Sequence, residues 1–242
     1  MKHIHRFFIS HTLCTGDRAV LDRDDSFHAV RVLRLDEGDS VELAGDDGRV
    51  FTATITAVAP AVAAVAGAEV KAGGPEFELT VVQALPKGRK LDLIVEKLSE
   101  IGVARLSPVY TSGSVVRPAA GTDARLDRWR RIARAAASQS RRARIMEVDA
   151  PVELAGWIES FSGGIIVLAT ETEGCGLSEA LEDAGEPLAL VVGPEAGFSA
   201  EEIAALRGAG AAFAHLGSRI LRTETAPLVA AAIALNRAGE LG

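Results

Sequence analysis

The segment Leu216–Ala226, LGSRILRTETA, places charged side chains between apolar stretches. The guanidinium of Arg222 is suited to stabilise negative charge that develops on a reacting oxygen. The carboxylate of Glu224 is suited either to accept a proton or to orient Arg222. We favour the orienting role, because an arginine–carboxylate pair is strong and has a fixed geometry. By itself the segment is equally consistent with a solvated loop in which Thr223 or Thr225 caps the following helix.

A second candidate segment, Gly193–Phe198, reads GPEAGF and follows the apolar run Leu188–Val192. Glycines allow a backbone to approach a ligand closely, and open parallel sheets bind ligands at the carboxyl ends of their strands. Both candidate segments follow a predicted strand, so we expect them at the same edge of one sheet. An ordinary turn between a strand and a helix is the competing interpretation of Gly193–Phe198.

The elements that would position these segments follow residue 76, where short apolar runs alternate with helical patterns. The runs are Leu79–Leu85, Arg105–Tyr110, Gly164–Thr170, Leu188–Val192 and Ala212–Leu216. Strands that alternate with helices predict a parallel sheet covered on both faces. Apolar residues recur with helical spacing in Arg89–Ile101, and Gly102 is suited to end that helix. Ser199 and Glu202 have the spacing of a capping box.

The first 70 residues are predicted to be mostly β-structure. Val41–Ile55 alternates apolar and polar residues around a Gly/Asp turn, which predicts a hairpin, and Val62–Val70 is a candidate further strand. Short strands joined by tight turns predict a small barrel. Lys71–Pro75, KAGGP, is rich in residues that interrupt regular structure and predicts a linker. We therefore expect two domains, residues 1–72 and 76–242.

Arginine is concentrated in one stretch of an otherwise acidic chain. Nine arginines and two aspartates lie between Arg117 and Arg144, so this stretch carries +7 and the remainder of the chain, whose net charge is −7, carries −14. Four apolar residues in the stretch share one helical face: Leu126, Trp129, Ala133 and Ala136. A helix that packs on one face and presents arginine on the other indicates contact with a polyanion rather than a merely solvated surface.

Several other kinds of protein are not supported. No apolar run is long enough to span a membrane, and the polar N-terminus does not resemble a secretory signal. Two isolated cysteines exclude a disulfide framework and fit a reducing cytoplasm, and no CxxC spacing predicts a metal site. Gly208–Phe213 lacks the third glycine of a dinucleotide fingerprint, and Leu85–Lys90 lacks the spacing of a phosphate-binding loop. A nucleotide enzyme of either kind is therefore disfavoured.

Three segments together resemble one family: Gly193–Phe198, Leu216–Ala226 and Lys97–Val103, KLSEIGV. They are similar to the 16S ribosomal RNA uridine-N3 methyltransferases of the SPOUT superfamily. The resemblance extends to Ala136–Arg142 and to His28–Arg34, which is similar to the family's PUA-like RNA-binding barrel. It implies an α/β fold, with a SPOUT-type, trefoil-knotted, parallel-sheet methyltransferase domain preceded by a small PUA-like β-barrel. The expectation of a knot follows from the resemblance alone.

The resemblance implies an enzyme that transfers a methyl group from S-adenosylmethionine to N3 of a uridine in 16S ribosomal RNA. That uridine would have to be unpaired or flipped, because N3 takes part in Watson–Crick pairing. The small ribosomal subunit would be the partner, and the enzyme would be a cytoplasmic homodimer without a metal or a membrane partner. Two alternatives stay open: a SPOUT methyltransferase that acts on a ribose 2′-hydroxyl or on transfer RNA, and a non-catalytic RNA-binding relative.

The resemblance also assigns roles to individual residues, with Arg222 and Glu224 as the catalytic pair. The cofactor would lie among three loops that contain Leu168, Thr170, Glu171, Gly193, Pro194, Glu195, Gly197, Leu216, Gly217, Ile220, Leu221, Thr223, Thr225 and Ala226. The RNA would contact Arg6, Arg31, Arg34, Arg128, Arg131, Arg134, Gln139 and Arg142.

This chain departs from the family pattern at two places near the expected site. The family usually has two glycines where this chain has Ala196 and Gly197, and an alanine forced to a positive φ would cost about 1 kcal/mol. The family also usually has an arginine within Tyr110–Val116, where Gly113 stands in this chain. Arg117 is a candidate substitute for that arginine.

Overall fold

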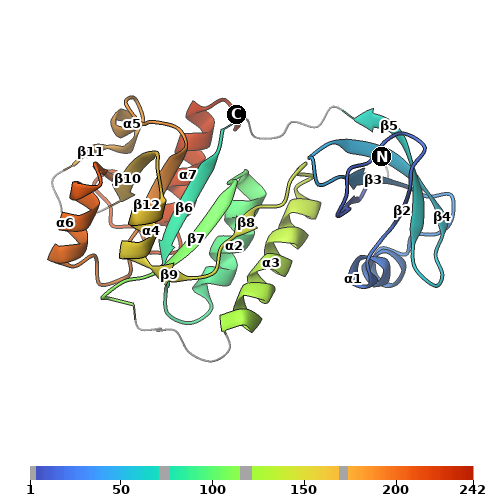
Figure 1. Cartoon of the computed structure of the whole chain (residues 1–242), viewed down its shortest axis with the longest axis horizontal. Coiled ribbons are helices and arrows are strands. Elements are labelled where there is room, and N and C mark those ends of the chain that lie inside the picture. The colour runs from blue at the N-terminus through green and yellow to red at the C-terminus, as the bar shows by residue number, and fades with distance from the viewer. Residues whose placement is uncertain (1–3, 71–76, 115–121, 169–173, 242) are drawn as a thin grey trace. The chain divides into compact units, whose positions relative to one another are not determined.

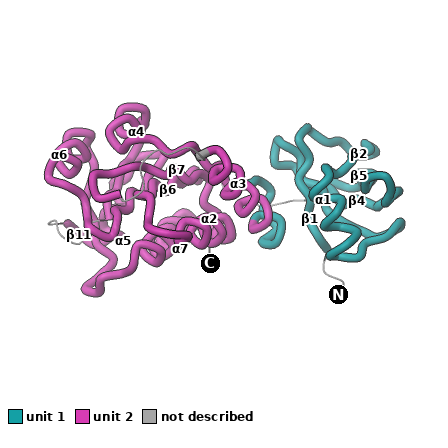
Figure 2. The backbone as a smooth tube through the Cα atoms, turned by 90° about the horizontal axis from the view of Figure 1, so that it is seen from below, with its two compact units in different colours: residues 1–74, 137–145 teal, residues 75–136, 146–242 magenta. Residues whose placement is uncertain are grey.

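The structure is a computed structural model that describes residues 4–70, 77–114, 122–168 and 174–241 (Figure 1). The chain forms two compact units (Figure 2). Unit 1 contains residues 1–74 and 137–145, and unit 2 contains residues 75–136 and 146–242. Residues 137–145 fall in the second domain expected from the sequence, whereas in the structure they pack with unit 1. No helix within the described ranges is both long enough and apolar enough to cross a membrane.

Unit 1 is built around a five-stranded sheet. Its elements are β1 (Arg6–Phe8), β2 (Arg18–Val20), α1 (Arg23–Phe27), the π-helix η1 (His28–Val32), β3 (Ser40–Ala44), β4 (Val50–Ala57) and β5 (Ala63–Val70). The strand order is β1-β3-β4-β5-β2, with β1 parallel to β3 and the other neighbours antiparallel. The hairpin predicted over Val41–Ile55 is confirmed as β3 and β4. Inward-facing residues of these strands, including Leu43, Phe51 and Ile55, form the core.

Residues 137–145 complete the packing of unit 1. Ala137 and Ala143 lie in a small buried cluster with Phe8, Ala44 and Val50. These apolar side chains exclude water from the end of the sheet where β1, β3 and β4 meet. The segment therefore contributes to unit 1 although its neighbours in the sequence belong to unit 2.

Arg6 anchors the same segment with polar contacts. Its buried guanidinium donates two hydrogen bonds to Glu42, 3.0 Å from Nε and 2.8 Å from Nη2. Nη1 of Arg6 donates to the carbonyl of Arg141, and the hydroxyl of Ser138 donates to the carbonyl of Arg6. Arg141 has a positive φ of 58°, a conformation that non-glycine residues rarely adopt. One arginine thus joins β1, β3 and the segment contributed from beyond residue 136.

Unit 2 is a parallel sheet with helices on both faces, which confirms the prediction. Its strands are β6 (Leu79–Ala84), β7 (Arg105–Tyr110), β8 (Glu147–Val148), β9 (Val152–Glu153), β10 (Gly164–Leu168), β11 (Cys175–Gly176), β12 (Leu188–Val192) and β13 (Ala212–His215). Its helices are α2 (Lys90–Ile101), α3 (Thr122–Gln139, which ends in unit 1), α4 (Leu154–Ser160), α5 (Leu177–Ala180), α6 (Ala200–Gly208) and α7 (Ala226–Arg237). Figure 2 shows α4 and α6 on one side of β6 and β7, with α2 and α7 on the other.

The strand order of unit 2 is β11-β13-β10-β12-β6-β7-β8, and β9 also pairs with β7. Every recorded pairing in this sheet is parallel, so the described strands end at one common edge. β13 pairs with β10 rather than with β12, which precedes it in the sequence. The carboxyl ends of β10, β12 and β13 consequently lie next to one another. That the chain forms a trefoil knot along this path stays a prediction.

The helix signals in the sequence are largely confirmed. The α2 residues Leu91, Ile94, Val95 and Leu98 are buried, and Gly102 ends this helix in the left-handed conformation with a φ of 112°. Ser199 and Glu202 form the predicted capping box of α6. Only the last helix differs, because α7 begins without a hydrogen bond from the side chain of its N-cap residue, Thr225.

The arginine-rich helix is α3, and its predicted apolar stripe is buried. The stripe residues are Leu126, Trp129, Ala133 and Ala136. The hydroxyl of Ser99 on α2 donates a hydrogen bond of 2.9 Å to the carbonyl of Ala133, which fixes the two helices to each other. α3 therefore packs on one face, as expected, and the positions of its arginines decide which of them can reach a ligand.

Candidate active site

A cleft lies at the common carboxyl edge of β10, β12 and β13. It encloses about 710 Å³ of empty space, a volume that includes its open mouth. Its lining residues are Leu168, Val192, Gly193, Pro194, Glu195, Gly197, Phe198, Ala214, His215, Leu216, Arg219, Ile220, Leu221, Thr223 and Ala226. Two segments supply most of the wall: the glycine loop, Gly193–Phe198, and the charged loop, Leu216–Ala226.

The cleft brings together most of the residues expected to bind a cofactor. Leu168, from the end of β10, meets residues of both loops. Gly217 and Thr225 belong to the charged loop but do not line the cleft. Thr170 and Glu171 lie outside the described residues. Five residues that line the cleft are not among those expected to bind the cofactor: Val192, Phe198, Ala214, His215 and Arg219. Each is in or beside a segment already singled out.

The glycine loop tolerates its alanine without strain. Gly197 has a positive φ of 75°, while Ala196 is outside the left-handed region. The methyl group of Ala196 therefore carries none of the cost that a positive φ would impose. The departure from the two-glycine pattern falls at a position where glycine is not required.

Gly113 allows another loop to approach the glycine loop closely. A Cβ atom at this position would lie 3.1 Å from Cγ of Pro194 and 3.5 Å from Cβ of Ala196. The preceding residue, Ser112, donates from its backbone to Glu202 on α6 at 2.6 Å, which holds the approach in place. An arginine at position 113 would require the two loops to move apart. The candidate substitute, Arg117, lies outside the described residues.

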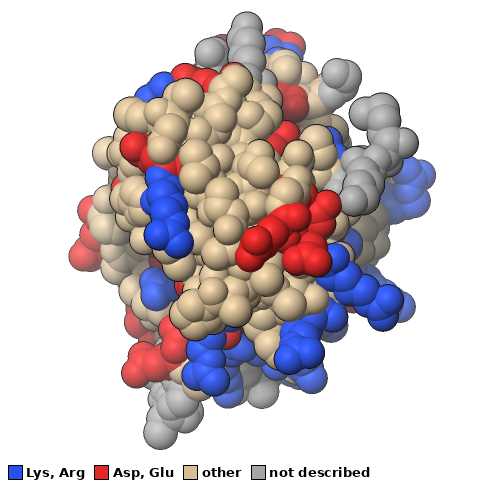
Figure 3. Space-filling view, turned by 90° about the vertical axis from the view of Figure 1, so that its right-hand side faces the viewer, with Lys and Arg blue, Asp and Glu red and all other residues tan. Residues whose placement is uncertain are grey.

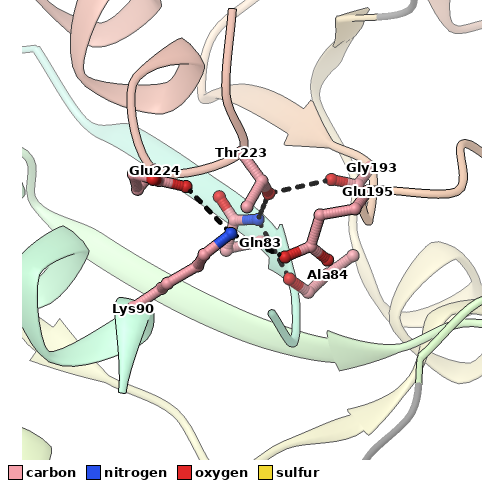
Figure 4. Close-up of polar contacts among 7 residues, drawn as sticks. All are labelled: Gln83, Ala84, Lys90, Gly193, Glu195, Thr223 and Glu224. Atoms are coloured by element: carbon pink, nitrogen blue, oxygen red, sulfur yellow. Dashed lines mark hydrogen bonds and ion pairs between the residues drawn. The ribbon is translucent and has the colours of Figure 1, made fainter. Parts of the chain in front are cut away.

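Thr223 joins the two loops directly. Its hydroxyl donates a hydrogen bond of 3.2 Å to the carbonyl of Gly193. The same hydroxyl accepts a hydrogen bond of 3.2 Å from the amide nitrogen of Gln83, which also donates to the carbonyl of Ala84 at 2.9 Å. Figure 4 shows these hydrogen bonds, which connect the end of β6 through Thr223 to the glycine loop. Thr223 thus links loops instead of capping α7.

Lys90, the first residue of α2, forms a second connection between the loops. Its ammonium lies 2.9 Å from Oε1 of Glu195 and 3.2 Å from Oε2 of Glu224 (Figure 4). Hydrogen bonding to Glu195 and then to Glu224 raises the pKa of Lys90. Partial burial raises the pKa of Glu195, but the contact with Lys90 and backbone hydrogen bonds outweigh it and leave that pKa below its usual range. All three groups are therefore charged at neutral pH.

The expected pair of Arg222 and Glu224 is arranged differently from the prediction. Within the described residues the ion-pair partner of Glu224 is Lys90, and no ion pair joins Glu224 to Arg222. Backbone hydrogen bonding lowers the pKa of Glu224, burial opposes it, and Lys90 and then Arg222 lower it further. The side chain of Arg222 is exposed, while its carbonyl accepts hydrogen bonds from Thr225 and Ala226 at the start of α7. Neither Arg222 nor Glu224 lines the cleft.

Two of the arginines expected to contact RNA are buried. Arg6 is 5% exposed and pairs with Glu42, and Arg142 is 8% exposed. Burial lowers the pKa of Arg142 to about 10. From the sequence alone, an arginine that is buried inside the protein cannot be distinguished from one that binds phosphate, because its spatial neighbours are unknown. We withdraw both from the RNA-contact set.

The remaining RNA candidates are more accessible. Arg31, Arg34, Arg131 and Gln139 are exposed, whereas Arg128 and Arg134 are half-buried. Arg128 donates to Asp92 on α2 at 2.6 Å, so its charge is already compensated. In Figure 3 several lysine and arginine side chains lie toward the lower edge of the face shown, and acidic side chains lie just right of its centre and at its lower left. Arg31, Arg34 and Arg131 remain exposed candidates for phosphate contact, which are fewer arginines than the count predicts.

No group of three or more potential metal ligands occurs in the part of the chain that the structure describes. The two cysteines, Cys14 and Cys175, are free.

Two family models match the chain. The model of an RNA methyltransferase domain matches residues 74–235, and the model of an RNA methyltransferase PUA domain matches residues 21–60. The chain is therefore an RNA methyltransferase with a PUA domain. The parallel sheet with the cleft at its carboxyl edge lies in the methyltransferase domain, and the small N-terminal sheet contains the PUA domain.

Individual relatives narrow this class. Ribosomal RNA small subunit methyltransferase E of Mycobacterium bovis is 35% identical over 97% of this chain and 91% of its own length. The enzyme of that name from Neisseria gonorrhoeae, solved with S-adenosylmethionine bound, matches with a TM-score of 0.86 and 27% identity over 97% of this chain and 98% of its own. A putative methyltransferase from Legionella pneumophila, also with bound S-adenosylmethionine, has a TM-score of 0.88 at 26% identity over 97% and 98% of the two chains. The chain belongs to the ribosomal RNA small subunit methyltransferase E family.

Proposed function

We propose that the protein transfers the methyl group of S-adenosylmethionine to N3 of a uridine in the 16S ribosomal RNA of the small subunit. The observation that carries this proposal is the cleft between the glycine loop and the charged loop in a chain of this family. Two similar structures contain S-adenosylmethionine, which supports the same cofactor here. We place the activity in the cytoplasm, with the small ribosomal subunit as partner.

The lining of the cleft fits this cofactor. Leu168, Leu216 and Leu221 offer apolar surface to the flat adenine ring. Glu195 also lines the cleft, where the contact with Lys90 holds its side chain in place. When bound, S-adenosylmethionine supplies the methyl group. The residues of the chain would hold the cofactor and the uridine in line, which is the larger contribution to the rate.

The two charged residues that the sequence singled out take different roles. Uracil N3 carries a proton and becomes a good nucleophile only when that proton is lost. Arg222 has an exposed guanidinium beside the cleft, suited to stabilise negative charge that spreads onto the uracil oxygens. Glu224 has a lowered pKa and is held by Lys90, which makes it a weak base and favours a positioning role.

The proposed function is tested by methyl transfer to small ribosomal subunits isolated from a strain that lacks the enzyme. The expected product is N3-methyluridine in 16S RNA, identified by mass spectrometry of nucleosides. A 2′-O-methylated nucleoside, or methylation of added transfer RNA only, would support the alternative of another target. Binding of RNA without any methyl transfer would support a non-catalytic relative.

We expect exposed arginines of both units to contact RNA phosphates. Replacing Arg31 and Arg131 together with alanine should weaken RNA binding and reduce the salt dependence, as the slope of log K against log salt, by about 1.5, since each phosphate contact contributes roughly 0.7–0.9. Arg105→Ala is the matched control, because this arginine already pairs with Glu147 and Asp149. Filter binding over a tenfold range of salt, from about 50 to 500 mM, measures the slopes. An unchanged slope in the double variant would remove these two arginines from the interface.

We further propose that the protein is a homodimer that uses the surface of α2 and α7. Leu93 on α2 and Val229 on α7 are 44% and 37% exposed, and Ile220 in the charged loop is 84% exposed. Apolar side chains of this size, on two helices that pack together and on the adjoining loop, support an interface beside the cleft.

Val229→Asp should shift the protein from dimer to monomer, because it introduces a charge into an apolar contact. Sedimentation velocity at several protein concentrations measures the change. Val152→Asp serves as the control, since Val152 is similarly exposed, at 43%, but lies on β9. A monomeric wild-type protein, or equal effects of the two substitutions, would refute this interface.

A further inference from the structure

The glycine loop and the charged loop approach the same cleft from different parts of the chain. Gly193 and Thr223 are 30 residues apart, and the helix α6 and the strand β13 lie between them. A ligand that contacts both loops binds well only if they are held in the correct relative position before it arrives. The side chains that connect the loops are therefore part of the binding site even when they do not touch the ligand.

The connecting side chains come from one further segment, the end of β6 and the start of α2. Gln83 is fully buried and donates to the hydroxyl of Thr223 in the charged loop. Its donation to the carbonyl of Ala84 fixes the orientation of the amide, because a flipped amide would place two oxygens together. Lys90, at the other end of this connection, contacts Glu195 and Glu224. One connection thus supports both loops.

The charges at Lys90 make its contribution different from that of an ordinary surface ion pair. Two carboxylates, one from each loop, converge on a single ammonium group (Figure 4). The side chains of Lys90, Glu195 and Glu224 are 37%, 38% and 18% exposed, so solvent screens them only in part. With Lys90 present, each loop is attracted to the same point. Without it, the two carboxylates repel each other and push the loops apart.

We propose that Lys90 is a positioning residue that fixes the glycine loop and the charged loop in the arrangement that receives the cofactor, by bridging Glu195 and Glu224. The inference rests on the proposed cofactor, S-adenosylmethionine. It adds the connection between β6 and α2 to the glycine loop and the charged loop, which follow β12 and β13. Lys90 acts through the two glutamates and is not required to contact the cofactor.

The test compares the affinity of the full-length protein for S-adenosylmethionine by titration calorimetry. Lys90→Met should weaken binding roughly three- to tenfold, the scale of two partly exposed ion pairs lost together, and Lys90→Arg should restore part of it. Lys97→Met is the matched control. Lys97 lies on the same helix, is 38% exposed and also pairs with two glutamates, Glu96 and Glu100, but these belong to α2 itself. The Lys97→Met variant should bind the cofactor with the affinity of the wild-type protein.

A charge-removal variant separates bridging from a general structural effect. In a protein that already carries K90M, adding E224Q removes one of the two repelling carboxylates and should recover part of the lost affinity. In the presence of Lys90, the same E224Q substitution should weaken binding, because it removes half of the bridge. This reversal of sign is expected only if the lysine acts through the glutamates. Melting temperatures without cofactor show whether each variant is folded.

The outcomes separate this inference from the proposed function. If the wild-type protein does not bind S-adenosylmethionine, the proposed function fails. If the wild-type protein binds it and K90M behaves like K97M, the bridging role of Lys90 is refuted. A loss of affinity in K90M that E224Q fails to recover, or deepens, also refutes bridging and assigns Lys90 to fold stability or direct contact.

Discussion

Replacing Arg222 with alanine is expected to slow methyl transfer to small-subunit RNA by about 100-fold while changing the affinity for S-adenosylmethionine by no more than about twofold. The side chain is exposed, does not line the cleft, and forms no ion pair in the part of the chain that the structure describes. Its positive charge is therefore available to interact with the uracil and is not neutralised by a carboxylate of the described residues. Single-turnover methyl transfer and calorimetric titration of the cofactor measure the two effects separately.

Two further variants define what the result means. Arg222→Lys keeps a positive charge but loses the planar array of donors, so an intermediate rate is expected. Arg219→Ala should weaken cofactor binding instead, because Arg219 lines the cleft and Arg222 does not. Full turnover in the Arg222→Ala variant, with cofactor binding intact, would show that Arg222 takes no part in the chemistry.

The largest effect on stability is expected from Arg6→Met. The substitution leaves Glu42, which is 8% exposed, as a buried carboxylate without its partner, and it removes the donor to the carbonyl of Arg141. Breaking a buried ion pair from one side costs about 3–5 kcal/mol. The free energy of unfolding of unit 1 should fall by that amount, as measured by urea denaturation followed through circular dichroism.

A double variant tests the cause of that loss. Combining Arg6→Met with Glu42→Leu removes the orphaned carboxylate and should recover much of the lost stability, since apolar replacements of buried pairs are often tolerated. If the Arg6→Met variant had the same free energy of unfolding as the wild-type protein but bound RNA more weakly, Arg6 would be an RNA-contact residue, as the sequence predicted.

Local patterns in the sequence predicted the elements of unit 2 well. The spacing of Leu91, Ile94 and Leu98 is a property of a few neighbouring turns, and the structure buries all three. The position of both loops at one sheet edge followed from a general rule for parallel sheets. Strands of two residues, such as β8, β9 and β11, were missed because two residues are too few to show a period.

Contacts between distant residues were not predictable in the same way. Lys90 lies 105 residues from Glu195, and no local pattern indicates that their side chains meet. One sequence feature did point to Lys90, because its segment follows a predicted strand just as the two loops do. That segment was compared only with the spacing of a phosphate-binding loop, which it does not match. The burial of Arg6 was likewise invisible without the position of Glu42.

The placement of residues 137–145 in unit 1 affects how the protein is made. The N-terminal sheet emerges from the translating ribosome first, yet Ala137 and Ala143, which complete its packing, are synthesised about 70 residues after β5 ends. At roughly 5–20 residues per second, this delay lasts about 3.5–14 s. During that interval Phe8 and Val50 lack their apolar cover and Arg6 lacks its contact with Arg141. The first unit to be synthesised therefore cannot finish folding until about two fifths of the second unit has been synthesised.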